Sequence, residues 1–320
     1  MAEETGGRPE DNYRPRYAEI PSFMRYPIAN GPADVDIGLI GIPFDLGVTN
    51  RPGARHGPRQ VRDMSSFMRR SHHVSLITPD EHLRIGDLGD VPLNPFSIEK
   101  CVALMTEYYN RVVDAGTAPL SVGGDHLVSY PILRALGRDR PLGLVHFDAH
   151  CDTAGDFLGA KYHHGAPFRL AVEEGVLDPK RIIQIGIRGS LTDPDIWKFS
   201  HDSGMRVVYI EEYFDRGGPD WVIEEARKIA GDGPVYVSFD VDGLDPVYAP
   251  GTGTPESGGF SMYEAQKMIR GLQGLDIVGG DVVEVSPPFD ASGNTALNAA
   301  TILFEILCVL ADARVRARGE

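Results

Sequence analysis

The sequence has few cysteines and no apolar leader. Its 320 residues include only Cys101, Cys151 and Cys308, which are far apart and form no CxxC pair. This argues against a disulfide framework and a zinc finger and indicates a reducing compartment, so we expect a cytoplasmic protein. The first residues, MAEETGGRPEDNYRPRY, are charged and lack the apolar segment of a secretory signal. We expect residues 1–30 to form an N-terminal arm.

Basic residues and long hydrophobic runs are also scarce. Lys and Arg number 31 against 46 Asp and Glu, which gives a formal net charge of −15. Nucleic acids and anionic membranes bind basic surfaces, so we expect neither as a partner, whereas a cationic small molecule would suit this field. The most apolar stretch, residues 301–311, is interrupted by Glu305 and falls short of the ~20 residues of a membrane span.

The sequence instead alternates short apolar runs with longer segments of helical period. Runs rich in β-branched residues predict eight strands, at 35–42, 82–88, 119–124, 142–148, 181–187, 206–210, 235–240 and 276–285. Several are apolar on both faces, which is typical of a parallel sheet covered by helices on both sides. Because no composition break follows the arm, we expect residues 31–315 to form one α/β catalytic domain.

Three polar residues predict helix starts, because each can accept a hydrogen bond from a free amide of the first helical turn. Ser97 precedes a helical run to about residue 115, Ser261 precedes YEAQKMIRGL, and Asn294 precedes a long segment that ends near residue 311. In open parallel sheets, ligands bind beyond the carboxyl ends of the strands. We therefore expect functional residues where the strands end.

One strand end combines carboxylates with a histidine. In HFDAHCD, Asp148, His150 and Asp152 occupy every second position and so share one face of an extended chain. Cys151 points to the opposite face and is expected to pack in the interior. Buried carboxylates without a partner are costly, so this face indicates a metal site.

Two further strand ends point the same way. In SFDVDGLDP, Asp240 and Asp242 lie two apart, and like charges this close resist joint ionisation unless a cation neutralises them. In SVGGDH, His126 follows two glycines that allow close backbone approach. Four carboxylates and two imidazoles would hold two divalent cations that share two carboxylates. This oxygen-rich set favours Mn²⁺, with Zn, Co or Ni as alternatives, and paired metals ~3.5–4 Å apart commonly activate a shared water as a nucleophile.

The motifs GGDH, HFDAHCDT, SFDVDGLDP, APGTGTPE and DVVEVSPP, together with NRPGARHGPR, resemble the ureohydrolase family of arginases and agmatinases over about residues 35–311. The resemblance implies a three-layer α/β/α fold with a mostly parallel eight-stranded sheet. It also implies two Mn²⁺ per chain, a trimeric or hexameric assembly, and hydrolysis of a guanidinium group to urea and an amine. By this resemblance His126 and Asp152 would hold one metal, His150 and Asp242 the other, and Asp148 and Asp240 would bridge them.

Chemistry and resemblance together assign three catalytic roles. Glu284, at the end of DIVGGDVVEV, can hold a planar guanidinium through paired hydrogen bonds. His164, in YHHGAPF, resembles the family's proton-shuttling histidine, although the adjacent His163 leaves this assignment open by one position. Asp152 would pass a proton to the departing amine.

The substrate's tail is less constrained. The match is to the agmatinase branch, which includes guanidinobutyrase and guanidinopropionase. An ammonium tail would favour Asp156, and a carboxylate tail would favour Lys161 or Arg51. The loop of residues 154–163, which contains Asp156 and Lys161, also offers three residues to line an apolar channel, namely Phe157, Leu158 and Tyr162. The negative field of the chain places agmatine slightly ahead of guanidinobutyrate.

Two other classes of function compete with this hypothesis. A zinc amide hydrolase of the related deacetylase group would use an Asp/His/Asp set at one metal, and it would leave His126 and Asp152 without a metal. A catalytically silent subunit that serves an active paralogue is disfavoured by the complete ligand set.

Overall fold

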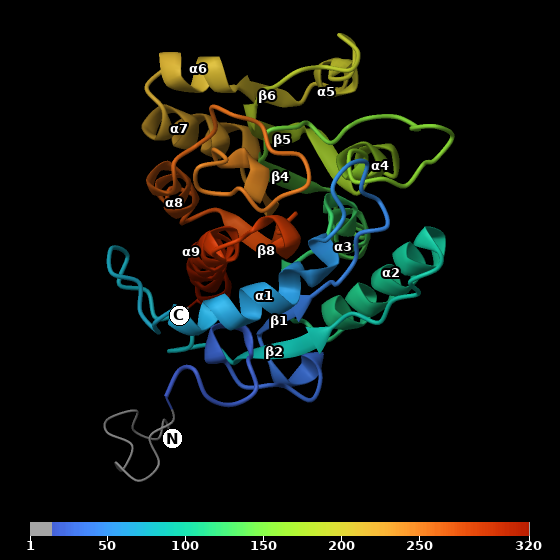
Figure 1. Ribbon diagram of the computed structural model, residues 1–320. Helices are drawn as coiled ribbons and strands as arrows, with labels where there is room; N and C mark the ends of the chain where they lie inside the picture. Colours follow the sequence, from blue (N-terminus) through green and yellow to red (C-terminus); the bar gives the residue numbers. More distant parts are fainter. Residues whose placement is uncertain (1–14, 320) are drawn as a thin grey trace.

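The computed structural model describes residues 15–319, which are organised around one eight-stranded sheet (Figure 1). The strands are β1 (Ile37–Gly41), β2 (Ile85–Asp90), β3 (Ala118–Val122), β4 (Leu142–Phe147), β5 (Leu177–Ile187), β6 (Arg206–Tyr209), β7 (Pro234–Asp240) and β8 (Asp276–Val283). Their order is β2-β1-β3-β8-β7-β4-β5-β6, and every neighbouring pair is parallel. All eight predicted strands are present, and the predicted parallel sheet is confirmed.

Helices cover both faces of this sheet, which gives the predicted three layers (Figure 1). One face carries α1 (Gly57–Met64), α7 (Pro219–Ala230), α8 (Met262–Arg270) and α9 (Asn294–Ala317). The other face carries α2 (Ile98–Asp114), α3 (Ser129–Leu136) and α4 (Pro167–Glu173). The short α5 (Lys198–Ser203) and α6 (Ile210–Asp215) lie at the β6 edge. Each face of the sheet packs against its helices in a separate hydrophobic cluster. In β1, Leu39 belongs to the cluster under α9 and Ile40 to the cluster under α2, as expected for a strand that is buried on both faces.

Two of the three predicted helix starts are confirmed. Ser97 accepts a hydrogen bond from the backbone N–H of Lys100 at the start of α2. Ser261 forms a capping box with Glu264, in which each side chain accepts from the other residue's backbone N–H, at the start of α8.

The third helix start was assigned to the wrong residue. Asn294 lies inside α9, and its side-chain amide donates to the carbonyl of Tyr248 at 2.9 Å. The turn before the helix instead brings the carboxylate of Asp290 back over the first turn, where it accepts from Thr295 N and Ala296 N at 3.1 and 3.0 Å. The cap was misplaced because its acceptor lies several residues upstream of the helix.

Helix α9 is also longer than the apolar stretch predicted for it. It has 24 residues, enough by length and composition to cross a membrane, and 72% of its most apolar window is buried inside the protein. Such burial is typical of a core helix, and α9 packs along β8, α8 and α1.

The second half of the predicted N-terminal arm packs against the β2 edge. Phe23 is fully buried, and its backbone N–H donates to Asp87 Oδ2 at 2.9 Å. The guanidinium of Arg62 lies over the Phe23 ring at 4.3 Å. Residues 1–14 of the arm lie outside the described residues.

Candidate metal centre and substrate cavity

The polar residues of the site follow four strands that are neighbours in the middle of the sheet. In the order β3-β8-β7-β4, these strands lead into His126, Glu284, Asp240 and Asp148. The carboxyl ends of parallel strands meet at one edge of the sheet, so residues far apart in sequence converge there.

The turn after β3 places His126 and depends on a close backbone approach. A Cβ at Gly124 would lie only 1.6 Å from the carbonyl oxygen of Phe44, so only glycine fits at this position. The next residue, Asp125, donates its N–H to that same carbonyl at 2.8 Å, and Glu284 donates its N–H to the Gly124 carbonyl at 2.8 Å. The turn is therefore fixed to the loop after β1 and to the end of β8.

His126 presents one ring nitrogen to three carboxylates. Its Nδ1 lies 3.1, 3.0 and 3.2 Å from Oδ2 of Asp148, Asp152 and Asp240. The imidazole is fully buried, and this Nδ1 has no hydrogen-bond partner among the described residues.

The opposite nitrogen of the ring fixes its tautomer. Ser238 donates its hydroxyl proton to Asp281 Oδ1 at 2.6 Å, so the same hydroxyl oxygen accepts from His126 Nε2 at 2.9 Å. In the neutral ring Nδ1 then carries a lone pair. A lone pair facing three carboxylate oxygens is satisfied by a cation placed between them, so these residues fit a metal ion.

A second group lies beside the first and shares Asp148 with it. The Nδ1 of His150 is 3.4 Å from Asp148 Oδ1 and 3.2 Å from Asp242 Oδ2, and these three side chains can converge on one ion. The structure thus brings together all six residues predicted as ligands, with Asp148, Asp152 and Asp240 beside His126 and with Asp148 and Asp242 beside His150. The assignment of each residue to one ion stays a prediction.

The charges in this cluster also favour bound cations. Burial, reinforced by the charges of Asp242 and Asp148, raises the pKa of Asp240 well above its usual range. Burial and the charge of Asp148 raise the pKa of Asp242 to about 6. Divalent cations would remove this penalty by neutralising the carboxylates.

Two site residues have a backbone conformation that is unusual for a side-chain-bearing residue. Asp152 and Glu284 have φ angles of 51° and 65°, in the left-handed region. Such conformations cost ~1–3 kcal/mol and concentrate at functional sites, where the surrounding structure holds them in place. Here they aim both carboxylates into the site.

Glu284 has one occupied and one open oxygen. It is buried, and its Oε1 accepts from the backbone N–H of His126 at 3.0 Å and from His164 Nδ1 at 2.9 Å. Its Oε2 is buried without a hydrogen-bond partner in the described part of the chain. Glu284 was predicted to hold a guanidinium through two hydrogen bonds. In the structure only its Oε2 is free to accept one.

Of the two adjacent histidines, His164 is the one that contacts Glu284. Although burial lowers the pKa of His164, its hydrogen bond to Glu284 and the charge of that residue raise it overall, to about 9. His163 instead has its Nε2 2.9 Å from the carbonyl of Gly155 and is bound to the loop. The shuttle role predicted for the histidine before glycine thus fits His164.

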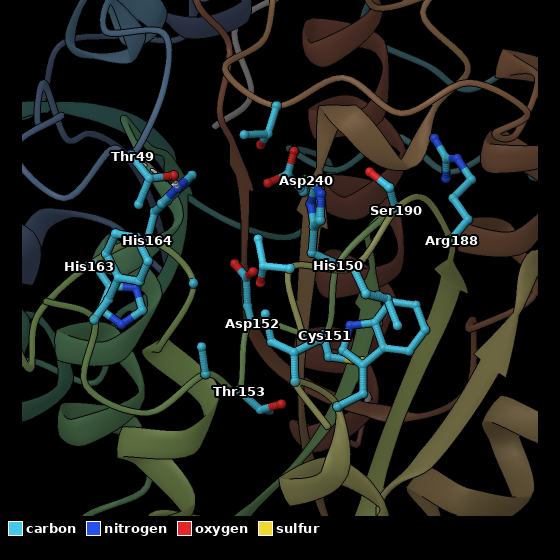
Figure 2. Close-up of a pocket in the computed structure, with 18 residues that line it drawn as sticks. Thr49, His150, Cys151, Asp152, Thr153, His163, His164, Arg188, Ser190 and Asp240 are labelled. Atoms are coloured by element: carbon cyan, nitrogen blue, oxygen red, sulfur yellow. Dashed lines mark hydrogen bonds between the residues drawn. The ribbon is translucent and has the colours of Figure 1, made fainter. Parts of the chain in front are cut away.

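A cavity of about 280 Å³ opens beside this group; His150, Asp152, Asp240 and His164 line it, whereas the buried Glu284 does not. Figure 2 shows Thr49, His163 and His164 to one side of the ligands His150, Asp152 and Asp240, with Arg188 and Ser190 to the other side. Four large apolar residues also line it, namely Phe157, Leu191, Ile196 and Trp197.

The predicted tail-binding residues do not line this cavity, apart from Phe157. Asp156 is exposed and borders a neighbouring surface pocket. The ammonium of Lys161 is exposed and lies 5.5 Å from the centre of the Tyr162 ring. Leu158 is 93% exposed. The buried Cys151 packs against Ile187 and Val207, as expected for an interior residue, and it also borders the cavity.

Arg188, at the end of β5, is a buried cation on the cavity wall. Its guanidinium donates to the carbonyl of Asp242 at 2.7 Å and to that of Glu256 at 2.7 Å. Arg188 therefore links the segment that carries Asp242 to the segment that carries Glu256. Its charge remains close to the cavity while its donors are used by the backbone.

A match to a known protein family spans most of the chain. The arginase family matches residues 35–309. The chain belongs to the arginase family. This confirms the resemblance found in the sequence motifs.

Individual relatives of this arginase-family protein cover nearly its whole length. It is 57% identical over 304 residues to the guanidinopropionase of Pseudomonas aeruginosa, covering 95% of each chain. It is 46% identical over 303 residues to the mitochondrial agmatinase of Gallus gallus, covering 94% of this chain and 89% of that one. The solved proclavaminate amidinohydrolase of Streptomyces clavuligerus matches with a TM-score of 0.90 and 39% identity, covering 94% of this chain and 100% of that one.

The sequence analysis of this arginase-family chain missed Arg188 on the cavity wall and two further residues of the site. His146 is fully buried with its Nε2 2.7 Å from Asp148 Oδ2, and it lies on the same strand face as Asp148, so the alternation that found Asp148 extends to it. Thr49 contacts His164 across 115 positions of sequence, and no local pattern indicates that contact.

Proposed function

We propose that this protein hydrolyses a linear guanidino acid, such as guanidinopropionate or guanidinobutyrate, to urea and the corresponding amino acid, with two Mn²⁺ bound per chain. The observation that carries the choice of substrate is the charge of the cavity wall. Among the described residues that line it, the only acids are Asp152 and Asp240, and both belong to the ligand set. The only lysine or arginine among those same residues is Arg188.

This wall suits a carboxylate tail better than an ammonium tail. With both acids engaged by metals, an ammonium group would find no carboxylate in the cavity, whereas a carboxylate would lie in the field of Arg188. The net negative charge that placed agmatine slightly ahead acts over longer distances and is screened beyond ~8–10 Å at moderate ionic strength. The higher identity to the guanidinopropionase than to the agmatinase supports the same choice.

The residues of the chain would divide the reaction between them. His126, Asp148, Asp152 and Asp240 would hold one cation, and His150, Asp148, Asp240 and Asp242 the other. Bound divalent cations lower the pKa of a shared water and so supply a nucleophile near neutral pH. Glu284 would accept a guanidinium N–H at its free Oε2 and so orient the carbon toward the ligand set. The oxygen of a water molecule bonds to the guanidinium carbon, the C–N bond to the alkyl chain breaks, the departing amine takes a proton, and urea leaves.

Proton movement would fall to Asp152 and His164. Asp152 lines the cavity and would protonate the departing amine. His164, held by Glu284 at the cavity wall, would return a proton from solvent. A cytoplasmic location and a trimeric or hexameric assembly stay predictions from the sequence.

The test is urea release by the Mn²⁺-loaded protein together with an ion count. We expect urea from guanidinopropionate and guanidinobutyrate, and two Mn²⁺ per active chain by elemental analysis. Absence of urea from every guanidino compound tried would contradict the proposal. A single ion in fully active protein would remove the two-metal part of it.

A further inference from the structure

Both nitrogens of the His164 ring are engaged, one of them by a residue that the reaction described above does not use. Nδ1 lies 2.9 Å from Glu284 Oε1. Nε2 lies 2.8 Å from the hydroxyl oxygen of Thr49 and 3.3 Å from the backbone N of the same residue. Thr49 lines the cavity on the same side as His164 (Figure 2).

A hydroxyl can serve both protonation states of this ring. In the neutral ring Nδ1–H donates to Glu284, and the lone pair of Nε2 accepts from the Thr49 hydroxyl. In the charged ring Nε2 carries a proton, which it can donate to the same oxygen after the hydroxyl rotates. The backbone N–H of Thr49 can only donate, so it serves the neutral ring alone.

Hydrogen bonds hold the loop on both sides of Thr49, which is itself exposed. The carbonyl of Gly47 accepts from His164 N at 2.9 Å, and Gly47 N donates to Asp125 Oδ2 at 2.8 Å. At the other end of the loop, Asp45 Oδ2 accepts from Gly53 N at 2.8 Å. Thr49 is thus attached to the segment that carries His164 and to the turn that carries His126.

We propose that Thr49 is a positioning residue that holds Nε2 of His164 through both protonation states during turnover. This inference rests on the proposed function, in which His164 transfers protons. It says that Nε2 of His164 keeps its contact with the Thr49 hydroxyl while Nε2 loses a proton and takes up another from solvent. The other charged groups that act on the ring are Glu284, Asp152 and Asp125, all carboxylates that favour the charged form. Thr49 is the neutral group that supplies an acceptor for the second proton.

Two substitutions separate the hydroxyl from the rest of the side chain. Thr49→Val keeps the shape and the backbone N–H but removes the hydroxyl, and Thr49→Ser keeps the hydroxyl. We expect Thr49→Val to lower kcat roughly tenfold or more, because a hydrogen bond to a charged group is lost, while KM changes less than about twofold. Thr49→Ser should restore most of this loss. Thr106→Val, which removes a hydroxyl that donates to Val102 on α2, is the matched control and should leave kcat unchanged.

A second measurement does not depend on turnover. Nitrogen-15 NMR of the histidine rings reports the tautomer and the pKa of His164 in each variant. The charged ring loses its acceptor in Thr49→Val, so the pKa of His164 should fall in that variant and return toward the wild-type value in Thr49→Ser. The alkaline limb of the pH–rate profile should move in the same direction.

The outcomes separate this inference from the proposed function. Wild-type kcat together with an unchanged His164 pKa in Thr49→Val would overturn the inference, as would equal losses in the valine and serine variants. If the wild-type protein releases no urea from any guanidino compound, the proposed function fails, while the NMR comparison still decides whether Thr49 holds the ring. If Thr49→Val does not fold, Thr49→Ala provides the same comparison with Thr49→Ser.

Discussion

His146 Nε2 lies 2.7 Å from Oδ2 of Asp148, the carboxylate common to both candidate metal groups. The side-chain amide of Gln184 approaches the other ring nitrogen, Nδ1, at 3.3 Å and can donate to it. The ring proton then resides on Nε2 and is donated to Asp148. His146, His126 and Asp148 lie close enough together to hold one ion. Because the His146 ring donates its proton to Asp148, we infer that His146 orients this shared ligand and does not itself bind the metal.

His146→Phe tests this orienting role. We expect Mn²⁺ affinity to fall about 10- to 100-fold, which is usual when a partner that orients a ligand is removed. Calorimetric titration with Mn²⁺ measures it. His201→Phe is the matched control, because His201 is exposed on α5 and bonds to Tyr209 there. Equal Mn²⁺ affinity in the wild-type protein and His146→Phe would show that the hydrogen bond to Asp148 does not matter.

Asp240→Asn should lower the occupancy of both ions together. Asp240 lies 3.2 Å from His126 Nδ1, and its Oδ1 accepts from the backbone N–H of Asp242, so it lies between the two groups. Replacing its charge with a neutral amide weakens an oxygen ligand that both cations would share. Elemental analysis after gel filtration counts the ions. Asp156→Asn, exposed and outside the cavity, should keep the wild-type count, and loss of only one ion in Asp240→Asn would contradict a shared role.

Glu284→Gln should keep the metals but lose most activity. The neutral amide weakens the contacts to His164 and to a guanidinium, and hydrogen bonds that involve charge contribute ~1.5–3 kcal/mol, so we expect kcat/KM to fall roughly 10- to 150-fold. Steady-state kinetics with an ion count on the same sample separates this loss from loss of metal. An unchanged kcat/KM would remove Glu284 from the site.

The contact between His164 and Glu284 predicts a pH dependence of stability. Although burial lowers the pKa of His164, its contact with Glu284 raises it overall to about 9, above the usual ~6.5 of an unfolded chain. A raised histidine pKa stabilises the fold fully below ~pH 6.5, and this contribution is lost as the pH rises through about 9. The difference of about 2.5 pH units corresponds to a contribution on the order of 3 kcal/mol.

Urea unfolding at pH 6.5 and 9.5 in the presence of a chelator measures this contribution. We expect the free energy of unfolding of the wild-type protein to fall more between these pH values than that of Glu284→Gln, because other titrating groups are common to both. Equal slopes in the two proteins would mean that Glu284 does not stabilise the charged form of His164.

The sequence predicted the fold, and it picked out the six candidate ligands that the structure brings together, because both depend on local patterns. Apolar runs defined all eight strands. The alternation in HFDAHCD singled out Asp148, His150 and Asp152, although β4 ends at Phe147 and Asp152 reaches the site through a left-handed φ of 51° rather than through an extended chain. Strand ends in a parallel sheet meet at one edge, so Asp240 and His126 joined them without any knowledge of strand order.

Apart from His146, which the local alternation could have included, the residues that the sequence missed are placed by distant contacts. Thr49 reaches His164 only after the loop that follows β1 is tied to the turn after β3. Asp290 caps α9 from a turn upstream, so the adjacent Asn294 was chosen wrongly. The positions of Asp156 and Lys161 depend on how their loop folds, which composition does not determine, and the structure places both outside the cavity.

The most direct test of the central claim is the ratio of kcat/KM for guanidinopropionate to kcat/KM for agmatine, measured in one buffer with the Mn²⁺-loaded protein, with arginine and guanidinobutyrate alongside. Arg188 is the only lysine or arginine among the described residues that line the cavity, and the two acids there belong to the ligand set. We therefore predict a ratio of about ten or more for a guanidino acid over agmatine, which corresponds to ~1.4 kcal/mol in transition-state binding. A ratio below one, with agmatine or arginine as the best substrate, would contradict the assignment to guanidino acids.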